Sequence, residues 1–267
     1  MPYRTTLCHT IIGSLISRIV STKKFCGTVF GLESANVVGY AQPSVRLNLS
    51  QQMPVFSDMG AQAVNIQNMI PVDADGNVLD YEFTIQEITD LGEVVKSYDY
   101  ITADSSDDGE MEGWLTYDDE TLEQKVVSRT FDIGEGFLVY STADGFMRYS
   151  GEVVMPQVLV PVRLNLSVQG NIRPTNVDIQ TLIPVDANGE VLDYEFTIQE
   201  TTDLGEVVKS YDYLTADSSD DGEMEGWLTY DDETLEQKVV TRTFAPGEGF
   251  LIYSTAEGFL SFPAINQ

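Results

Sequence analysis

The chain has 267 residues, of which 42% are hydrophobic and 10% aromatic, and its formal net charge is −29. This apolar content is enough for the core of one large or two ordinary globular domains. The acidic charge argues against binding to a nucleic-acid backbone and suits solubility, divalent cations or an extracellular setting. Cys8, His9 and Cys26 are the only Cys and His residues, and all precede Glu33. The rest of the chain therefore cannot form a disulfide, a thiolate or imidazole metal site, or a Ser-His-Asp triad.

The segment before Glu33 is basic and contains no acidic residue, whereas ten basic residues stand against 43 acidic ones from Glu33 onward. Within it, "KKFCGTVFGLESA" places Lys23 and Lys24 before the apolar run 25–32 and then small residues, the order of a compressed export signal. We predict that residues 1–33 are a leader and that the protein is secreted or held at the cell surface. An amphipathic or disordered leader is the alternative. No apolar run approaches the ~18 residues of a transmembrane helix, so no membrane span is expected.

The rest of the chain is dominated by one internal repeat. The sequence that begins at Ile70 returns at Ile183, an offset of 113 residues, and between Leu91 and Val127 the first copy differs from the second only at Ile101. Repeats can decide an architecture, and identity over both surface and core positions indicates a recent duplication. Matching residues between the copies are therefore not evidence of function.

The repeated unit has the size of a domain. "VRLNLS" at Val45 returns at Val162, an offset of 117, so the first copy carries four extra residues within "QQMPVFSDMGAQA", which we interpret as a loop. A unit of about 115 residues is a typical domain length. We predict two tandem domains, residues 34–154 (repeat one) and 155–267 (repeat two).

Short alternating stretches fill each unit. In chain order, repeat one offers "VRLNLS", "AVNIQNMIPV", a "DADG" hairpin turn at 73–76, "NVLDYEFTIQEI", "EVVKSYDYITA", "GWLTY", "QKVVSRTF", "GFLVYST" and "GFMRYSGEVV". Eight or nine short strands at this spacing predict an all-β fold. We expect two antiparallel, jelly-roll-like β-sandwich domains, with closed β-barrel units as the alternative. Pro156 and Pro161 predict a short, semi-rigid junction between them.

The stretches "ESANVVGY" and "GEGFLVYS…GFMRYSGEVV" resemble a loose group of uncharacterised exported bacterial proteins, in which a cleaved leader precedes ESANVVGY-like residues and repeats end in GxGF and SGEV strands. The resemblance covers most of the chain through short motifs. It implies export and a mature start near Glu33, and it carries over no catalytic residue and no ligand.

An acidic segment, "TADSSDDGEMEGW", is present in both repeats and is the candidate metal site. Counting from Asp104, its oxygens fall on the first, third and fifth positions of an EF-hand loop with Gly109 sixth, but Leu115 stands where the bidentate Glu belongs. A non-EF calcium loop and a solvated loop both remain open, and calcium is the only candidate cofactor. The predicted metal ligands are Asp104, Ser106, Asp108 and Glu112, with Asp217, Ser219, Asp221 and Glu225 in repeat two.

Aromatic residues flank this segment. Trp114 and Trp227 close its two copies and are the candidate ligand-binding residues, since aromatic rings stack on sugar faces. Tyr98, Tyr100 and Tyr117 lie close to the segment in sequence and belong to the same candidate sugar site. The alternative places these aromatic residues in the core and cross-strand pairs of a sandwich. A pair of carboxylates for glycoside hydrolysis is also conceivable, but no pair is singled out by the sequence.

These observations predict a non-enzymatic exported surface or matrix protein, structural or interacting, built of tandem β domains. A calcium-dependent carbohydrate-binding module is the alternative function. The expected partners are a second copy of the chain, through edge strands such as "NVVGY", or glycans, and no nucleic acid.

Overall fold

The computed structural model describes residues 40–41, 44–47, 52–56, 64–106, 108–118, 120–132, 134–148, 151–152, 156–202, 206–220, 222–231 and 233–265. Its regular elements are β-strands and four single-turn 3₁₀ helices. The predicted leader lies outside the described residues. No helix in the described ranges is long and apolar enough to cross a membrane.

Repeat one contains thirteen described strands and two 3₁₀ turns. In chain order they are β1 (Tyr40–Ala41), β2 (Ser44–Leu47), β3 (Gln52–Phe56), β4 (Val64–Asn65), η1 (Ile66–Asn68), β5 (Ile70–Val72), β6 (Phe83–Ile88), β7 (Val94–Ile101), η2 (Ala103–Ser105), β8 (Gly113–Tyr117), β9 (Gln124–Val126), β10 (Thr130–Phe131), β11 (Gly136–Ser141), β12 (Gly145–Arg148) and β13 (Gly151–Glu152).

Repeat two follows nearly the same order. Its elements are β14 (Val158–Val162), β15 (Asn165–Gly170), β16 (Val177–Asp178), η3 (Ile179–Thr181), β17 (Ile183–Val185), β18 (Phe196–Thr201), β19 (Val207–Leu214), η4 (Ala216–Ser218), β20 (Gly226–Tyr230), β21 (Gln237–Val239), β22 (Thr243–Phe244), β23 (Gly249–Ser254) and β24 (Gly258–Phe262).

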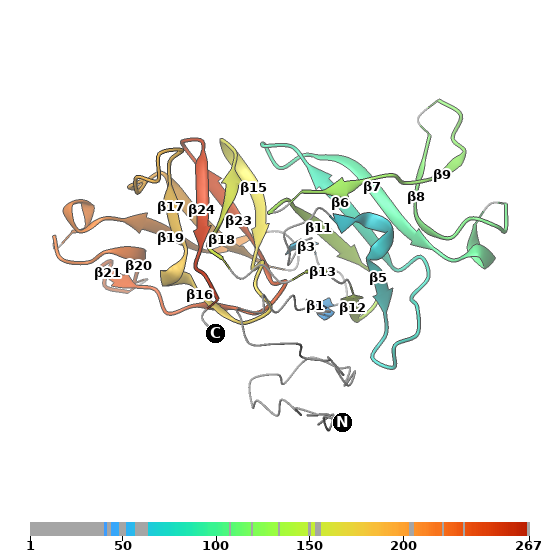
Figure 1. The fold of residues 1–267 in the computed structure, drawn as a ribbon, viewed down its shortest axis with the longest axis horizontal. Helices are drawn as coiled ribbons and strands as arrows, with labels where there is room; N and C mark the ends of the chain where they lie inside the picture. Colours follow the sequence, from blue (N-terminus) through green and yellow to red (C-terminus); the bar gives the residue numbers. More distant parts are fainter. Residues whose placement is uncertain are drawn as a thin grey trace, which may run out of the picture.

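Each repeat forms a large and a small antiparallel sheet (Figure 1). The large sheets have the orders β3-β11-β6-β7-β8-β9 and β15-β23-β18-β19-β20-β21, in which four consecutive strands make a meander. The small sheets have the orders β2-β12-β5 and β14-β24-β17. The outer strands of each described large sheet do not pair with each other, so the sheets stay open and the barrel alternative is wrong. The predicted all-β, antiparallel and sandwich-like architecture is confirmed.

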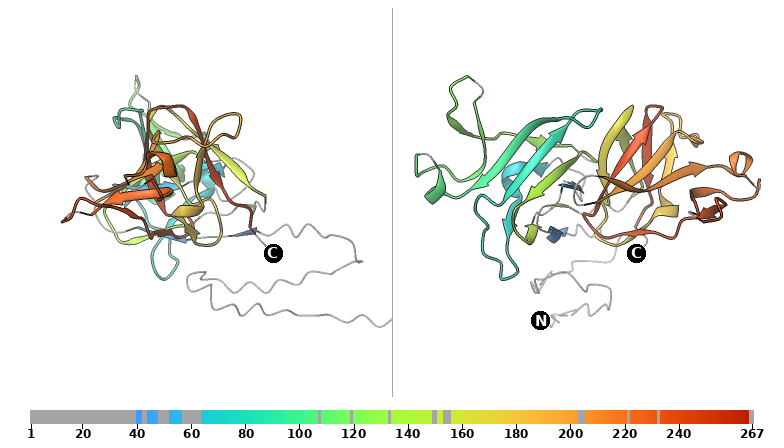
Figure 2. Two further views of the ribbon diagram at one scale, coloured as in Figure 1. Left: turned by 90° about the vertical axis from the view of Figure 1, so that its left-hand side faces the viewer. Right: turned by 180° about the vertical axis from the view of Figure 1, so that it is seen from behind.

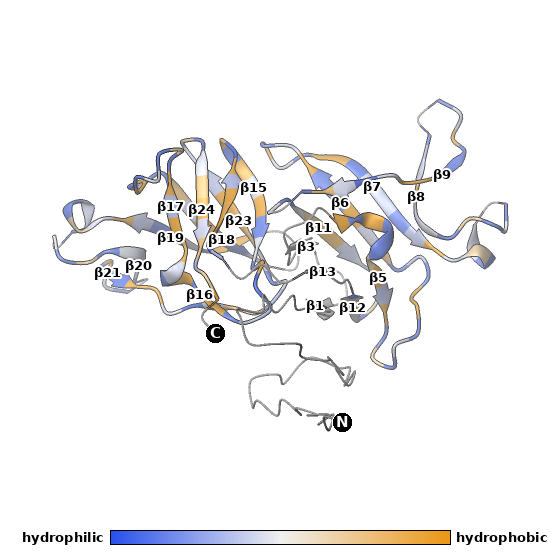
Figure 3. Cartoon of the chain, viewed as in Figure 1, coloured by the Kyte–Doolittle hydropathy of each residue, from blue (hydrophilic) through white to orange (hydrophobic). Residues whose placement is uncertain are grey.

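The alternation in the sequence decides which face of each large sheet is buried. In β6, Phe83 and Ile85 are buried and the residues between them are not, because successive side chains point to opposite faces of a strand. Ile85 lies opposite Tyr98 on β7 and Val139 on β11, both buried as well. The inner face is thus apolar across the strands, and Figure 3 shows apolar and polar residues interleaved along them.

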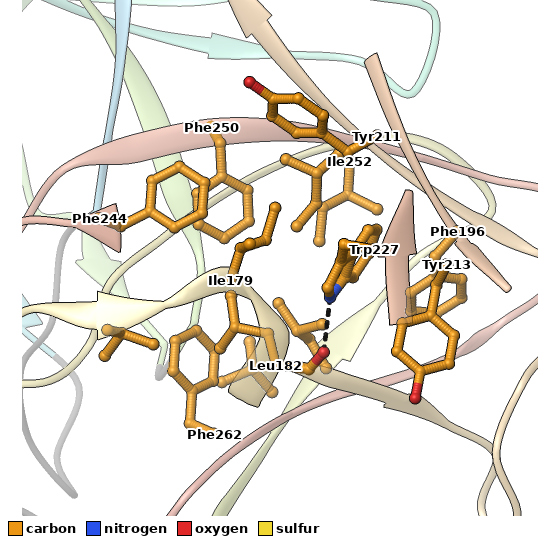
Figure 4. Packing of buried hydrophobic residues seen from close by; sticks show 14 of the residues in the cluster. Ile179, Leu182, Phe196, Tyr211, Tyr213, Trp227, Phe244, Phe250, Ile252 and Phe262 are labelled. Atoms are coloured by element: carbon orange, nitrogen blue, oxygen red, sulfur yellow. Dashed lines mark hydrogen bonds between the residues drawn. The ribbon is translucent and has the colours of Figure 1, made fainter. Parts of the chain in front are cut away.

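Each repeat has a core cluster of its own. Trp227 is completely buried in repeat two, packs edge-on to Tyr213 at a ring separation of 5.4 Å, and donates from Nε1 to the carbonyl of Leu182 at 2.7 Å (Figure 4). A buried indole needs such an acceptor, since an unpaired N–H in a core is costly. Trp114 makes the same arrangement in repeat one with Tyr100.

One sequence interpretation was wrong. The stretch "QQMPVFSDMGAQA", interpreted as a variable loop, contains strand β3, which pairs with β11. Its apolar residues form the unbroken run 53–56 with a proline inside, so the stretch shows no polar–apolar alternation from which a strand could be recognised. The "DADG" turn is confirmed: Gly76 donates to the carbonyl of Asp73, and Asp73 Oδ1 accepts from Asp75 N and Asn77 N.

The two repeats touch directly. The backbone N–H of Leu166 on β15 donates to the carbonyl of Asp90 at 3.0 Å, and Asn165 Nδ2 donates to Asp90 Oδ2 at 3.1 Å. A Cβ atom on Gly136 of β11 would lie 2.6 Å from Val168 Cγ1, so the approach requires glycine there. Figure 1 and the right-hand view of Figure 2 show the repeats side by side.

Candidate functional site

The acidic segment forms a self-braced loop after β7. Asp104 lies in η2, and Ser106 Oγ donates to the carbonyl of Ala103 at 3.0 Å and to Asp108 Oδ1 at 3.1 Å. Asp108 Oδ1 also accepts from the backbone N–H groups of Glu110 and Met111, which lowers the pKa of this carboxyl. The loop backbone therefore already uses the carboxylate oxygen that stands at the fifth calcium position.

The second copy is described in part. Asp217 lies in η4 and Ser219 Oγ donates to the carbonyl of Ala216 at 3.0 Å, whereas Asp221 lies outside the described residues. Glu112 and Glu225 raise the pKa values of Tyr100 and Tyr213 through their negative charge, after the larger effect of burial. Across the described ranges, no three His, Cys, Asp or Glu side chains gather closely enough to hold a metal ion. Calcium binding by the segment stays a prediction.

Trp114 and Trp227 are core residues. Each has no exposed surface, and each indole N–H is bonded to a buried backbone carbonyl. A sugar ring can stack only on an aromatic face that is open to solvent. The stacking role predicted for the two tryptophans does not fit this placement, and the core alternative does.

Two glutamates, Glu87 and Glu135, form ion pairs with the same arginine, Arg129. Arg129 Nε and Nη2 donate to the two oxygens of Glu87 at 3.0 and 3.1 Å, and Nη2 also pairs with Glu135. Burial alone would raise the pKa of Glu87, but hydrogen bonds from Arg129 and from the Tyr98 hydroxyl outweigh it and the pKa is lowered. Repeat two repeats the cluster with Tyr211, Glu200, Arg242 and Glu248.

The cluster of Glu87, Arg129 and Glu135 fits a structural role better than a catalytic one. A general acid for glycoside hydrolysis needs a raised pKa, and Glu87 has the opposite shift. The arginine also lies over the ring of Phe131, 4.4 Å from its centre, which fixes its position. Glu87 and Arg129 are 42 residues apart, and no spacing in the sequence connects them.

The junction of the repeats contains a small hollow of about 230 Å³. Its walls include Glu87, Asp90, Asp132, Glu135, Arg163 and Gln169. A second hollow of about 400 Å³ lies at the C-terminal end of repeat two beside Arg173, whose Nη2 donates to the carbonyls of Pro156 and Phe262. Burial lowers the pKa of this guanidinium. These bonds tie the start of repeat two to its last strand.

Among the described residues, the exposed aromatic side chains are tyrosines, and the sequence pointed only to Tyr117 among them. Tyr194 is 59% exposed, Tyr230 45% and Tyr253 43%, and their counterparts are Tyr81, Tyr117 and Tyr140. Tyr81 and Tyr194 have φ angles of 60° and 62°, a left-handed backbone that costs a bulky residue about 1–3 kcal/mol. Such backbone strain is found more often at functional sites, and no sequence pattern predicts it.

Comparison with known proteins gives no relative: no family model, no curated protein and no solved structure matches this chain.

Proposed function

We propose that the chain is a non-enzymatic exported protein of a surface or matrix, which acts by presenting two like β units in one body. The observation that carries the proposal is the direct contact between the repeats at Asp90, Asn165, Leu166 and the Gly136–Val168 approach. Because these contacts oppose free rotation, any surface that both repeats display is presented twice at a fixed separation. Such an arrangement raises avidity without new contacts.

The carboxylates support a non-enzymatic role. Where the pKa of a described Asp or Glu is shifted, it is lowered, as in Glu87, Asp108 and Asp118. These groups are charged at neutral pH and are held by backbone N–H groups or basic side chains. They are poor proton donors and serve as structural acceptors.

The free edges support an interaction protein over a self-assembling one. β9 and β21 are the outer strands of the large sheets on the side away from the junction, where the other outer strands, β3 and β15, contact each other, and they lie toward opposite ends of the molecule (Figure 1). Each has three residues with a central lysine, Lys125 or Lys238, and short strands with lysine resist pairing with another edge. The strand predicted at "NVVGY" is described only at Tyr40, where it pairs with β13.

The test is expression of the full chain in a bacterial host, followed by cell fractionation, N-terminal sequencing and sedimentation velocity of the recovered protein. The proposal expects material in the medium or surface fraction that starts near Glu33 and sediments as a monomer. Full-length protein retained in the cytoplasm, or concentration-dependent polymers, would contradict it.

A further inference from the structure

We propose that the outer face of each large sheet is a binding platform for a neutral polysaccharide, built on exposed tyrosines. The inference rests on the proposed function as an interaction protein and names its ligand class. We call Tyr194, Tyr230 and Tyr253 with the side chains between them the tyrosine platform of repeat two. Tyr81, Tyr117 and Tyr140 form its counterpart in repeat one.

The platform follows from strand register. Tyr253 lies opposite Thr197, Thr197 opposite Asp212, and Asp212 opposite Leu228. Residues that are directly opposite in antiparallel strands point to the same face, so this row shares the outer face of the sheet. Leu228 is only 2% exposed, so the part of the row that is open to a ligand runs from Tyr253 to Asp212. With strands about 4.8 Å apart, this part spans about 10 Å, long enough for about two sugar rings.

Tyr194 and Tyr230 complete the far end of the row. Tyr230 is two residues beyond Leu228 on the same strand and therefore on the same face. Tyr194 is held beside β19, where its N–H donates to the carbonyl of Tyr213 at 2.8 Å. The pKa of its phenol is raised, first by the negative charge of Asp212 in the row and then by burial, Tyr230 and Asp220.

The polar groups among these rings have the hydrogen-bonding chemistry of a glycan site. Thr197 Oγ1 donates to Asp212 Oδ1 at 2.7 Å, and among the described residues no donor reaches Asp212 Oδ2. Gln237 Nε2 donates to the hydroxyl of Tyr230 at 3.0 Å, which leaves that O–H as a donor. Fixed acceptors and donors between aromatic faces match the hydroxyls and the apolar faces of a sugar ring.

The negative charge of the platform distinguishes neutral polysaccharides from acidic ones and from protein partners. Asp212 stands in the row, and Asp220 donates from its backbone N–H to Gln237, the residue that contacts the Tyr230 hydroxyl. With a net charge of −29 on the chain, these acidic residues repel sulfated and uronic-acid glycans. The tyrosines are separated by the Thr197–Asp212 pair, whereas the centre of a protein interface is depleted of charge. A neutral polysaccharide is the occupant that fits both features.

The platform is present twice, and the strained tyrosine recurs in both copies. Repeat one has the row Tyr140, Thr84, Asp99, Leu115, Val126, with the same Thr84–Asp99 hydrogen bond at 2.7 Å. The carbohydrate ligand predicted from the sequence is thus proposed to bind exposed tyrosines, of which the sequence pointed only to Tyr117, and to bind without calcium.

The experiment is affinity electrophoresis of the full chain in native gels cast with a soluble β-1,3-glucan, galactomannan or arabinoxylan, with a hyaluronan gel as the acidic counterpart. We expect retardation in at least one neutral gel and none in hyaluronan. The variant Tyr81→Asn/Tyr194→Asn should bind at least about tenfold more weakly, because asparagine keeps the left-handed backbone but removes the ring. Tyr117→Ala/Tyr230→Ala, at unstrained positions, should weaken binding in the same way.

The matched control is Leu122→Asn/Leu235→Asn. Leu122 and Leu235 are 74% and 73% exposed and also left-handed, with φ of 59° and 58°, but lie outside the platforms. They should leave binding unchanged. The platform would be overturned if no neutral gel retarded the protein or if only the hyaluronan gel did. It would also be overturned if the leucine control lost as much binding as the tyrosine variants. Capture of a basic peptide, or dimers lost with the tyrosines, would assign the face to another occupant and overturn it as well.

Failure of this inference and failure of the proposed function are distinguishable. An exported monomer that no gel retards removes the platform and leaves the proposed function standing. A chain that cleaves the polysaccharide it binds keeps the platform and removes the non-enzymatic role.

Discussion

Replacing Gly113 by alanine tests the most specific packing in the structure. Gly113 has φ +110°, and a Cβ there would lie 2.2 Å from Oε1 of Gln67. Gln67 joins three backbone groups: its Nε2 donates to the carbonyls of Trp114 and Val127 at 2.8 and 2.9 Å, and its Oε1 accepts from the N–H of Trp114 at 3.0 Å. The added methyl group must displace this side chain.

The magnitude follows from two terms. The positive φ costs alanine about 1–2 kcal/mol, and each displaced hydrogen bond contributes about 1 kcal/mol. We therefore expect Gly113→Ala to lower the free energy of unfolding of repeat one by about 3–5 kcal/mol. Gly76→Ala is the matched control, because Gly76 has φ +87° with no atom within 4 Å of an added Cβ and should lose only the first term.

The assay is urea denaturation followed by the fluorescence of Trp114. All proteins carry Trp227→Phe, which leaves one of the two tryptophans and reports on repeat one. In a Gln67→Ala background, Gly113→Ala should cost no more than Gly76→Ala, since the clash is gone. Equal costs for Gly113→Ala and Gly76→Ala in the parent would refute the reasoning.

Three further predictions concern charge. Arg129→Gln should lower the free energy of unfolding by about 1–3 kcal/mol, because it removes the cation shared by two half-buried glutamates. Lys125→Gln at an exposed pair should cost under about 1 kcal/mol. Chemical denaturation compares the two variants, and equal costs would contradict the burial argument. The pKa of Glu87 lies below its ordinary 4.5, so its carboxylate stabilises the fold above pH 4.5. The difference in free energy of unfolding between wild type and Glu87→Gln should therefore narrow as the pH falls below that value. A difference that widens in acid would be inconsistent with the lowered pKa. If the acidic segment binds calcium, titration with millimolar Ca²⁺ should give a heat of binding and raise the Tm of the protein, both measurable by calorimetry. No heat of binding and no change in Tm would remove the predicted calcium site.

The positions of the strands and turns could be predicted from the sequence because they depend on residues that are close together in the chain. Alternation in "YEFTIQ" places Phe83 and Ile85 on one face, and the aspartate and glycine of "DADG" specify a turn, so both follow from local rules. The exclusion of Cys and His chemistry beyond residue 33 needs only composition.

The site could not be read in the same way because it depends on pairs that are distant in the chain. Gln67 meets Trp114 across 47 residues, and Tyr194 joins a row whose other members come from four later strands. Whether an aromatic residue faces the core or solvent is decided by that packing. Trp114 was therefore the stronger candidate from the sequence although it is buried, and the exposed Tyr81 gave no signal in the sequence.

The most direct test of the whole account is small-angle X-ray scattering from the monomeric protein recovered after export. The account predicts one rigid particle whose profile matches the two repeats in contact as in Figure 1, unchanged by moderate salt. Arg163, which lines the hollow between the repeats, gives a variant for comparison: Arg163→Ala should leave the profile unchanged, since the bonds to Asp90 come from Asn165 and Leu166. A profile that requires an ensemble of freely rotating repeats would contradict the fixed, paired presentation on which the proposed function depends.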